Sequence, residues 1–419
     1  MSEMAVKVQT GSETERRLFK EKNFVFLWLA GLFSSMSMSV FLFSQSWFVV
    51  QSLGLEASLG LIFIASTIPR LLFMAIGGVI ADRISRTKIM FISDITRALL
   101  VGGLVLFLIT DLINLWTLVF FALLFGVLDA FFWPASGSIL PTLVKSKHLT
   151  RANSIIQMTN QMAMIFGPMI AGFVIVLIGF TGSFTLTSVL LLLASVFVAF
   201  IKLAGKTSSN HAEESAPSLL QQLKQGIVYV KTSDQLSALL ITTAFLNLFI
   251  VGPLMMGLPL FVSNVLQGTT LDFSFLEGAF AAGMVAGSIT IAVLNVNKKR
   301  GFIAMLSVLG MSVALLVLSQ TFLLWQSMLA IFILGITFSF CNIPLISAIQ
   351  DMCDKNMIGR VMSLLTMSSM GLTPVSFAIT SLLLSIGVSI HYIMVTGAFL
   401  VMILVLFVFV KLPAVKTIH

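Results

Sequence analysis

The sequence predicts an all-α polytopic membrane protein in which twelve transmembrane helices form two six-helix halves. Composition is the first reason, because 58% of the 419 residues are hydrophobic and only 10% are charged. Soluble domains carry about 25% charged residues. The other two reasons are a series of long apolar runs and the position of the cations, most of which lie between those runs. A chain of this composition cannot fold as a water-soluble globule.

Each of the twelve apolar runs is near or above the roughly 20 residues that a helix needs to cross the hydrocarbon core. We expect helices because a spanning segment must satisfy its own backbone hydrogen bonds. The first run is too long for a signal-peptide core of roughly 7–15 residues. The predicted spans are 24–50, 57–81, 89–109, 115–143, 153–178, 183–203, 237–266, 273–295, 302–319, 323–350, 361–386 and 391–410.

A long polar stretch near the middle divides the spans six and six. Within it, apolar residues from Leu219 to Val230 recur at helical spacing. They predict an amphipathic helix that either lies on the cytoplasmic membrane face or packs on the helix bundle. The expected parts are a tail at 1–22, an N-terminal half at 23–203, a linker at 204–235, a C-terminal half at 236–411 and a second tail at 412–419.

The cations orient the chain. All of the 24 Lys and Arg residues except Arg70 and Arg97 fall on one side of a twelve-span weave, in tails, linker or loops. Because positively charged loops stay cytoplasmic, we expect both termini to be cytoplasmic and the protein to lie in the plasma membrane. The net charge of +8 is thus explained by the lipid bilayer, and no nucleic-acid partner is expected.

The sequence gives no sign of catalysis. It contains no His-Glu-x-x-His, Gly-x-Ser-x-Gly or Walker motif. Its two cysteines, Cys341 and Cys353, fit no disulfide framework and no metal-ligand spacing. We therefore expect no enzyme, no cofactor and no metal.

Two motifs of small and charged residues mark the first half. The connection after the second run reads Gly-Gly-x-x-Ala-Asp-Arg-x-x-Arg-x-Lys, and its defining residues are Gly77, Gly78, Asp82, Arg83, Arg86 and Lys88. Its glycines allow close helix packing, and Asp82 is placed to meet the positive N-terminus of a helix. The fifth run contains Gly167, Pro168 and Gly172, which permit a bend and close packing.

The two halves repeat each other weakly. Three landmarks recur in order at offsets of 212, 210 and 209: Arg86–Lys88 with Lys298–Arg300, Phe132–Pro134 with Asn342–Pro344, and Leu149–Arg151 with Ile358–Arg360. Such repeats are typical of transporters that bind their substrate at the midplane between two related halves.

These motifs resemble the signature loop and the antiporter motif of the drug:proton antiporter branch of the major facilitator superfamily. Further segments resemble macrolide-efflux proteins and the enterobactin exporter, namely Ile68–Arg70, Asp94–Ala98, Asp129–Ala135, Leu149–Asn153 and Gly359–Ser363. The resemblance implies a major facilitator fold and multidrug efflux by antiport. Residues Ser34–Val40 of the first run lack the acidic residue that many relatives place there.

Ionisable residues inside the spans are costly in lipid and normally face protein or water. Arg70, Asp94 and Arg97 predict an intramembrane charge cluster, since Asp94 and Arg97 are three residues apart on one helix. Asp129 and Glu277 have no obvious local partner, so we expect them to couple transport to protons, with Asp129 the first candidate. The alternative for Glu277 is a solvated carboxylate near a helix start.

The resemblance also implies that helices one, four, seven and ten line a central cavity. Its candidate lining residues are Gln45, Trp47, Asp129, Trp133, Asn247 and Asn342. The sequence thus predicts a monomeric secondary transporter that exports amphipathic small molecules, drug- or macrolide-type, in exchange for protons. Two alternatives stay open: a dedicated exporter of a metallophore, siderophore or other endogenous metabolite, and a non-transporting membrane sensor.

Overall fold

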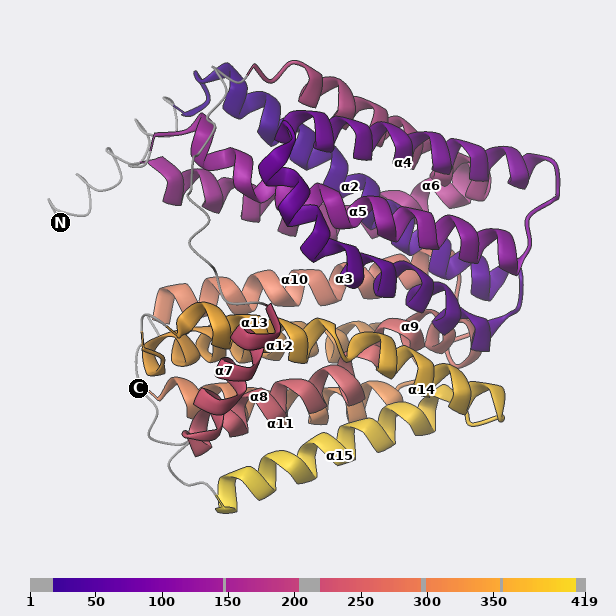
Figure 1. Cartoon of the computed structure of the whole chain (residues 1–419). Helices are drawn as coiled ribbons and strands as arrows, with labels where there is room; N and C mark the ends of the chain where they lie inside the picture. Colours follow the sequence, from indigo (N-terminus) through magenta and orange to yellow (C-terminus); the bar gives the residue numbers. More distant parts are fainter. Residues whose placement is uncertain (1–17, 146–147, 203–218, 295–298, 355–356, 412–419) are drawn as a thin grey trace, which may run out of the picture. The chain divides into compact units, whose positions relative to one another are not determined.

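The computed structural model describes residues 18–145, 148–202, 219–294, 299–354 and 357–411; the side-chain surroundings of 75–83, 150 and 219–223 lie outside this description. Within these ranges the chain is helical apart from short connections (Figure 1). Eleven of the described helices, some of them interrupted, are long and apolar enough to cross a membrane. They form two compact units.

The first unit is drawn from Met1–Phe48 and Ala65–Ser209. In Figure 1 its helices run from indigo to magenta: α2 (Lys22–Gln51), α3 (Leu59–Arg83), α4 (Arg86–Ile109), α5 (Leu115–Leu143) and α6 (Leu149–Ala199). α4 packs against both α5 and α6. Near the start of α2, an apolar core joins Phe24 of α2, Met90 of α4 and Ile139 of α5, all fully buried.

Helix α6 contains two of the predicted spans. Its candidate membrane segment has 49 residues, about 74 Å at 1.5 Å per residue, whereas the hydrocarbon core is about 30 Å thick. The helical conformation breaks at Gly179, whose φ is 71° and ψ is −175°. The eleven candidates in the described chain therefore account for the twelve predicted crossings.

The second unit is drawn from Val49–Ile64 and Asn210–His419. Its elements are the short helix η1 (Glu56–Ser58), α7 (Leu219–Lys231), α8 (Asp234–Leu246), the π-helical η3 (Asn247–Val251), α9 (Gly252–Asn264), α10 (Thr270–Leu294), α11 (Arg300–Ser319), α12 (Leu324–Met352), α13 (Ile358–Met370), α14 (Thr373–Ser385) and α15 (Ile390–Lys411). α12 packs between α10 and α11, and α11 also packs against α15.

Residues 49–64 belong to the second unit, although they precede most of the first in the chain. The Asn264 side-chain amide donates to the Glu56 carboxylate at 2.9 Å. The rings of Phe63 and Phe377 lie 5.0 Å apart between centroids. These contacts explain why residues 49–64 group with the second unit.

The linker contains the predicted amphipathic helix as α7. Gly226 lies against Leu364 and Arg360 of α13, and the Tyr229 hydroxyl accepts the Asp354 backbone N–H at 3.0 Å. These contacts are those of a helix that packs on the bundle.

The predicted seventh span is a helix with a widened turn. The Gly252 N–H bonds to the carbonyl of Asn247, five residues back, and Pro253 has no N–H to donate. The Leu248 carbonyl is therefore left without a backbone donor from the following turn. The Ser376 hydroxyl of α14 supplies one, at 2.5 Å. A buried carbonyl must find a partner in this way, so the π-helical turn fixes the contact between α14 and η3.

Replacing Gly252 with Ala should weaken this contact, because a Cβ at Gly252 would overlap the Ser376 hydroxyl. We expect Gly252→Ala to lower the free energy of unfolding by about 1–3 kcal/mol, the usual effect of overpacking. The measurement is the thermal unfolding midpoint of the purified protein. Ser376→Gly should restore part of the loss.

The matched control is Gly137→Ala in α5, where a Cβ meets nothing within 4 Å. This variant should stay within about 1 kcal/mol of the wild type, since alanine is the better helix former. Equal unfolding midpoints for Gly252→Ala and Gly137→Ala would contradict the close approach of Ser376.

Candidate functional site

A buried charge network lies among α3, α4 and α5 of the first unit. The Arg97 guanidinium contacts the Asp94 carboxylate at 2.5 Å and the Asp129 carboxylate at 3.0 Å. Arg70 approaches the second oxygen of Asp129 at 3.2 Å. The side chains of Asp94, Arg97 and Asp129 are at most 3% exposed, and that of Arg70 is 25% exposed. Two cations and two anions thus balance in formal charge.

Helix geometry and aromatic rings hold this network in place. Asp94 and Arg97 are one turn apart on α4, so their side chains share one face. The Arg97 guanidinium lies over the rings of Phe132 and Phe125 at 4.9 and 5.4 Å, where the ring quadrupole attracts a cation. The guanidinium is therefore held by carboxylates and by aromatic faces together.

Asp129 forms ion pairs with residues of two other helices. The sequence indicated no local partner for it, but Arg70 and Arg97 reach it from neighbouring helices. Spacing along one helix cannot reveal such pairs. Sequence reasoning also missed Ser34 of α2, whose hydroxyl lies 3.3 Å from both Asp94 Oδ1 and Arg97 Nη2. The run of serines in an otherwise apolar helix was the available signal.

The predicted signature motif does not lie wholly in a connection. α3 continues to Arg83 and α4 begins at Arg86, so Gly77, Gly78 and Asp82 belong to the last turns of a helix. Their side-chain surroundings, like that of Arg83, are outside the described part. Of the remaining two residues, Arg86 donates to the Ser138 carbonyl of α5 at 3.0 Å, and Lys88 is exposed.

The predicted antiporter motif lies where α6 meets α2. A Cβ at Gly167 would overlap the side chain of Ser39, so the two helices approach each other closely here. A hydrogen bond joins the same two helices nearby, where the Ser35 hydroxyl of α2 donates to Asn160 Oδ1 of α6 at 2.7 Å. Pro168 follows Gly167 within the helix, and Gly172 is buried further along.

Glu277 lies in α10 and is half-buried. It has no ion pair or hydrogen bond to any residue that the structure describes. The carboxylate at the start of α10 is Asp272, which accepts the Thr269 backbone N–H at 2.6 Å and the Thr269 hydroxyl at 2.9 Å. Glu277 is five residues further into the helix and makes no such bond.

Two cavity candidates meet in a pocket of the second unit. Asn247 and Asn342 both line a pocket of about 280 Å³ bounded by α8, α11, α12 and α13. In the first unit, Gln45 and Trp47 are buried in α2. Trp133 is 41% exposed, and the Arg70 guanidinium lies 6.0 Å from the centre of its ring.

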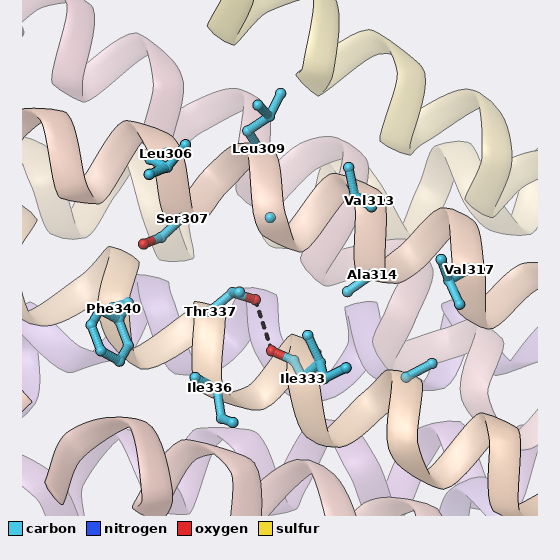
Figure 2. Close-up of a pocket in the computed structure, with 12 residues that line it drawn as sticks. Leu306, Ser307, Leu309, Val313, Ala314, Val317, Ile333, Ile336, Thr337 and Phe340 are labelled. Carbon is cyan, nitrogen blue, oxygen red and sulfur yellow. Dashed lines mark hydrogen bonds between the residues drawn. The ribbon is translucent and has the colours of Figure 1, made fainter. Parts of the chain in front are cut away.

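A larger pocket of about 580 Å³ lies between α11 and α12 (Figure 2). Its lining is apolar apart from Ser307 and Thr337. Both hydroxyls donate to carbonyls of their own helices. Ser307 donates to Ile303, and Thr337 donates to Ile333, as the dashed line in Figure 2 shows. The two hydroxyls in this lining therefore have no proton left to donate to a substrate. The pocket of about 280 Å³ that contains Asn247 and Asn342 is the better candidate for specific recognition.

Membrane-length helices with buried, paired charges define a polytopic membrane protein, and comparison with known proteins gives its family. The family model "Major Facilitator Superfamily" matches residues 27–378. The chain therefore belongs to the major facilitator superfamily.

Several curated proteins are similar over most of the chain. The uncharacterized MFS-type transporter YkuC of Bacillus subtilis is 25% identical over 410 residues, which cover 94% of each chain. Macrolide efflux protein A of Streptococcus pyogenes is 23% identical over 387 residues, 90% of this chain and 93% of that protein. Enterobactin exporter EntS of Escherichia coli is 23% identical over 299 residues, 70% and 68% of the two chains.

Solved structures share the fold. The nucleoside transporter NupG has a TM-score of 0.70 at 14% identity, covering 93% of this chain and 98% of that one. The D-xylose-proton symporter has a TM-score of 0.71 at 11% identity, covering 94% and 98%. At these identities the similarity concerns the fold alone.

Replacing Asp129 with Asn should destabilise the first unit, since it leaves Arg70 and Arg97 with one carboxylate. Removing one member of a buried ion pair costs about 3–5 kcal/mol. Adding Arg70→Gln should recover part of the loss because formal charge is balanced again. The measurement is the thermal unfolding midpoint of both variants. The exposed Asp111→Asn is the control and should change little; an unchanged midpoint in Asp129→Asn would contradict the network.

Replacing Gly167 with Ala should push α6 away from α2. We expect a loss of about 1–3 kcal/mol in the free energy of unfolding from overpacking, with partial rescue by Ser39→Gly. The control is Gly31→Ala in α2, where a Cβ meets nothing within 4 Å. If Ser39→Gly gives no rescue, the predicted overlap is not the cause of the defect.

Proposed function

We propose that this transporter exports amphipathic small molecules in exchange for protons, by alternating access of its two halves. The observation that carries the proposal is a set of ionisable groups inside apolar helices, because such groups mark substrate or proton pathways. Export as the direction of transport is supported by two relatives, which are named a macrolide efflux protein and an enterobactin exporter. Gly167, Pro168 and Gly172 support antiport through their resemblance to the antiporter motif.

The sequence ranked Asp129 before Glu277 as the candidate proton carrier. The contacts of the two carboxyl groups support the reverse ranking. A proton on Asp129 would leave Arg70 and Arg97 in excess of their carboxylate partners, and a buried uncompensated charge is costly. A proton on Glu277 disturbs no ion pair among the described residues. We therefore propose Glu277 as the proton carrier. Asp129 has the role of holding α3, α4 and α5 together.

The proposal also covers the orientation of the chain, the role of the signature motif and the oligomeric state. Their position on one side of the weave supports cytoplasmic termini in the plasma membrane. We assign the signature motif, from Gly77 to Lys88, to the conformational change, and we propose a monomer as the working unit.

The balance of the charge network bears on the substrate. A dedicated exporter of an anionic siderophore remains the second candidate, and the relative EntS favours it. However, the cations of Arg70 and Arg97 are matched by Asp94 and Asp129, so the network offers no surplus positive charge. This balance favours a neutral or weakly charged amphipathic substrate.

The test is flux in proteoliposomes with an imposed pH gradient, using a macrolide, a lipophilic cation and a catechol siderophore. We expect wild-type export of the macrolide to depend on the gradient. Glu277→Gln should still bind substrate but lose substrate-driven proton movement, because Gln cannot release a proton. Asp272→Asn, five residues earlier, is the matched control and should keep the coupling.

Three outcomes separate the proposals. Normal proton exchange in Glu277→Gln would remove Glu277 as the carrier. Transport of the siderophore alone would establish the second candidate. Absence of flux for every compound, with or without a gradient, would overturn export and favour a membrane sensor.

A further inference from the structure

We propose that the pocket around Asn247 and Asn342 binds a neutral, hydroxyl-bearing group of the substrate, and that it does so by accepting hydrogen bonds. The inference rests on the proposed function, since it assigns this pocket to the exported molecule. It goes further by naming the chemical group that the pocket selects.

The two asparagine amides point their oxygens away from their own helices. Asn247 Nδ2 donates to the Thr243 carbonyl at 2.9 Å, and Asn342 Nδ2 donates to the Phe338 carbonyl at 3.0 Å. A backbone carbonyl can only accept, so each amide must turn its nitrogen to that carbonyl. Each Oδ1 is left as an acceptor with no hydrogen-bond partner among the described residues.

Three hydroxyls in the lining have used their protons in the same way. Thr243 donates to Leu239, Thr366 to Met362 and Ser369 to Thr366, each to a backbone carbonyl of its own chain segment. A hydroxyl that has donated its proton still has lone pairs to accept a bond. These oxygens add to the acceptors that the two amides provide.

Thr242 gives an independent sign of a ligand. It is 0% exposed, it lines the pocket, and its hydroxyl has no hydrogen-bond partner in the described part of the chain. A buried polar group without a partner costs free energy, and native proteins rarely keep one without a reason. Because Thr242 lines the pocket, a bound ligand is the partner that we propose for this hydroxyl.

The charges of the lining narrow the ligand further. Among the residues that the structure describes, no Asp, Glu, Lys, Arg or His lines the pocket. An anion would meet several acceptor oxygens and no compensating cation, and a cation would be desolvated without a carboxylate; both are costly. A neutral hydroxyl group meets neither obstacle. The rest of the lining is apolar, with Leu246, Phe338 and Leu345 among its members, and suits an adjoining hydrocarbon part.

Size limits what can enter. The pocket of about 280 Å³ lies just below the range of roughly 300–1,000 Å³ that is usual for ligand sites. It has room for one hydroxylated ring with a short apolar tail. A larger substrate would place only that part of itself in the pocket.

A matched pair of compounds tests this chemistry. The probes are hexyl β-glucoside, which carries free hydroxyls, and its tetra-O-methyl ether, which keeps the ring but cannot donate. The measurement is equilibrium binding of the labelled compounds to the full chain in nanodiscs, after subtraction of binding to empty nanodiscs. With several hydrogen bonds of about 0.5–1.5 kcal/mol each, we expect the glucoside to bind on the order of tenfold more tightly.

Variants locate the preference in this pocket. Asn342→Leu should lower the preference by about twofold to threefold, because it removes one of the several acceptors. Thr242→Val should weaken glucoside binding without lowering the unfolding midpoint, because its hydroxyl makes no hydrogen bond to the described residues. Thr290→Val is the matched control: Thr290 lies on α10, does not line the pocket, and its hydroxyl bonds to the Ala286 carbonyl of its own helix.

Equal binding of the two compounds, an unchanged preference in Asn342→Leu, or no saturable binding of either compound would each overturn the inference. Flux in proteoliposomes separates this result from the fate of the proposed function. Macrolide export without a glucoside preference would leave export standing and remove the subsite. A glucoside preference without export of any compound would keep the binding site and remove the proposed direction of transport.

Discussion

The structure depends on one constraint: inside a bilayer every backbone polar group must find a partner within the protein, and a charge is costly unless it is paired. Arg97 shows the constraint for charges, since its guanidinium contacts Asp94 and Asp129 and lies over two aromatic rings. Leu248 shows it for the backbone. Its carbonyl loses its helical donor at the π-helical turn and regains one from Ser376 of another helix. In both cases the need to satisfy a polar group decides which helices pack together.

The two units meet this constraint by different means. In the first, ion pairs connect α3, α4 and α5, and removal of any one charge unbalances the others. In the second, the pocket is lined by amides and hydroxyls whose donors are bonded to nearby backbone carbonyls. A charged network loses stability when one of its members is removed, whereas a neutral lining can bind a hydrogen-bonding ligand without unbalancing any charge.

The constraint also explains how far the sequence could be interpreted. Helix positions were predictable because a spanning segment must be apolar and about 20 residues long; the span predicted at 115–143 matches α5 (Leu115–Leu143). The family was predictable from short motifs at fixed spacing. Contacts between helices were not: the partners of Asp129 are 59 and 32 residues away in the chain. The span predicted at 57–81 corresponds to α3 (Leu59–Arg83).

Asn247 joins the pocket and the irregular turn in one residue. Its side chain lines the pocket, while its backbone carbonyl accepts the Gly252 N–H that creates the π-helical turn. Such turns occur frequently at functional sites, and here the reason is physical. The widened turn begins at Asn247 and ends before Pro253, which has no N–H to restore the regular pattern. Asn247 therefore contributes its backbone to the turn and its side chain, held by the Thr243 carbonyl, to the pocket.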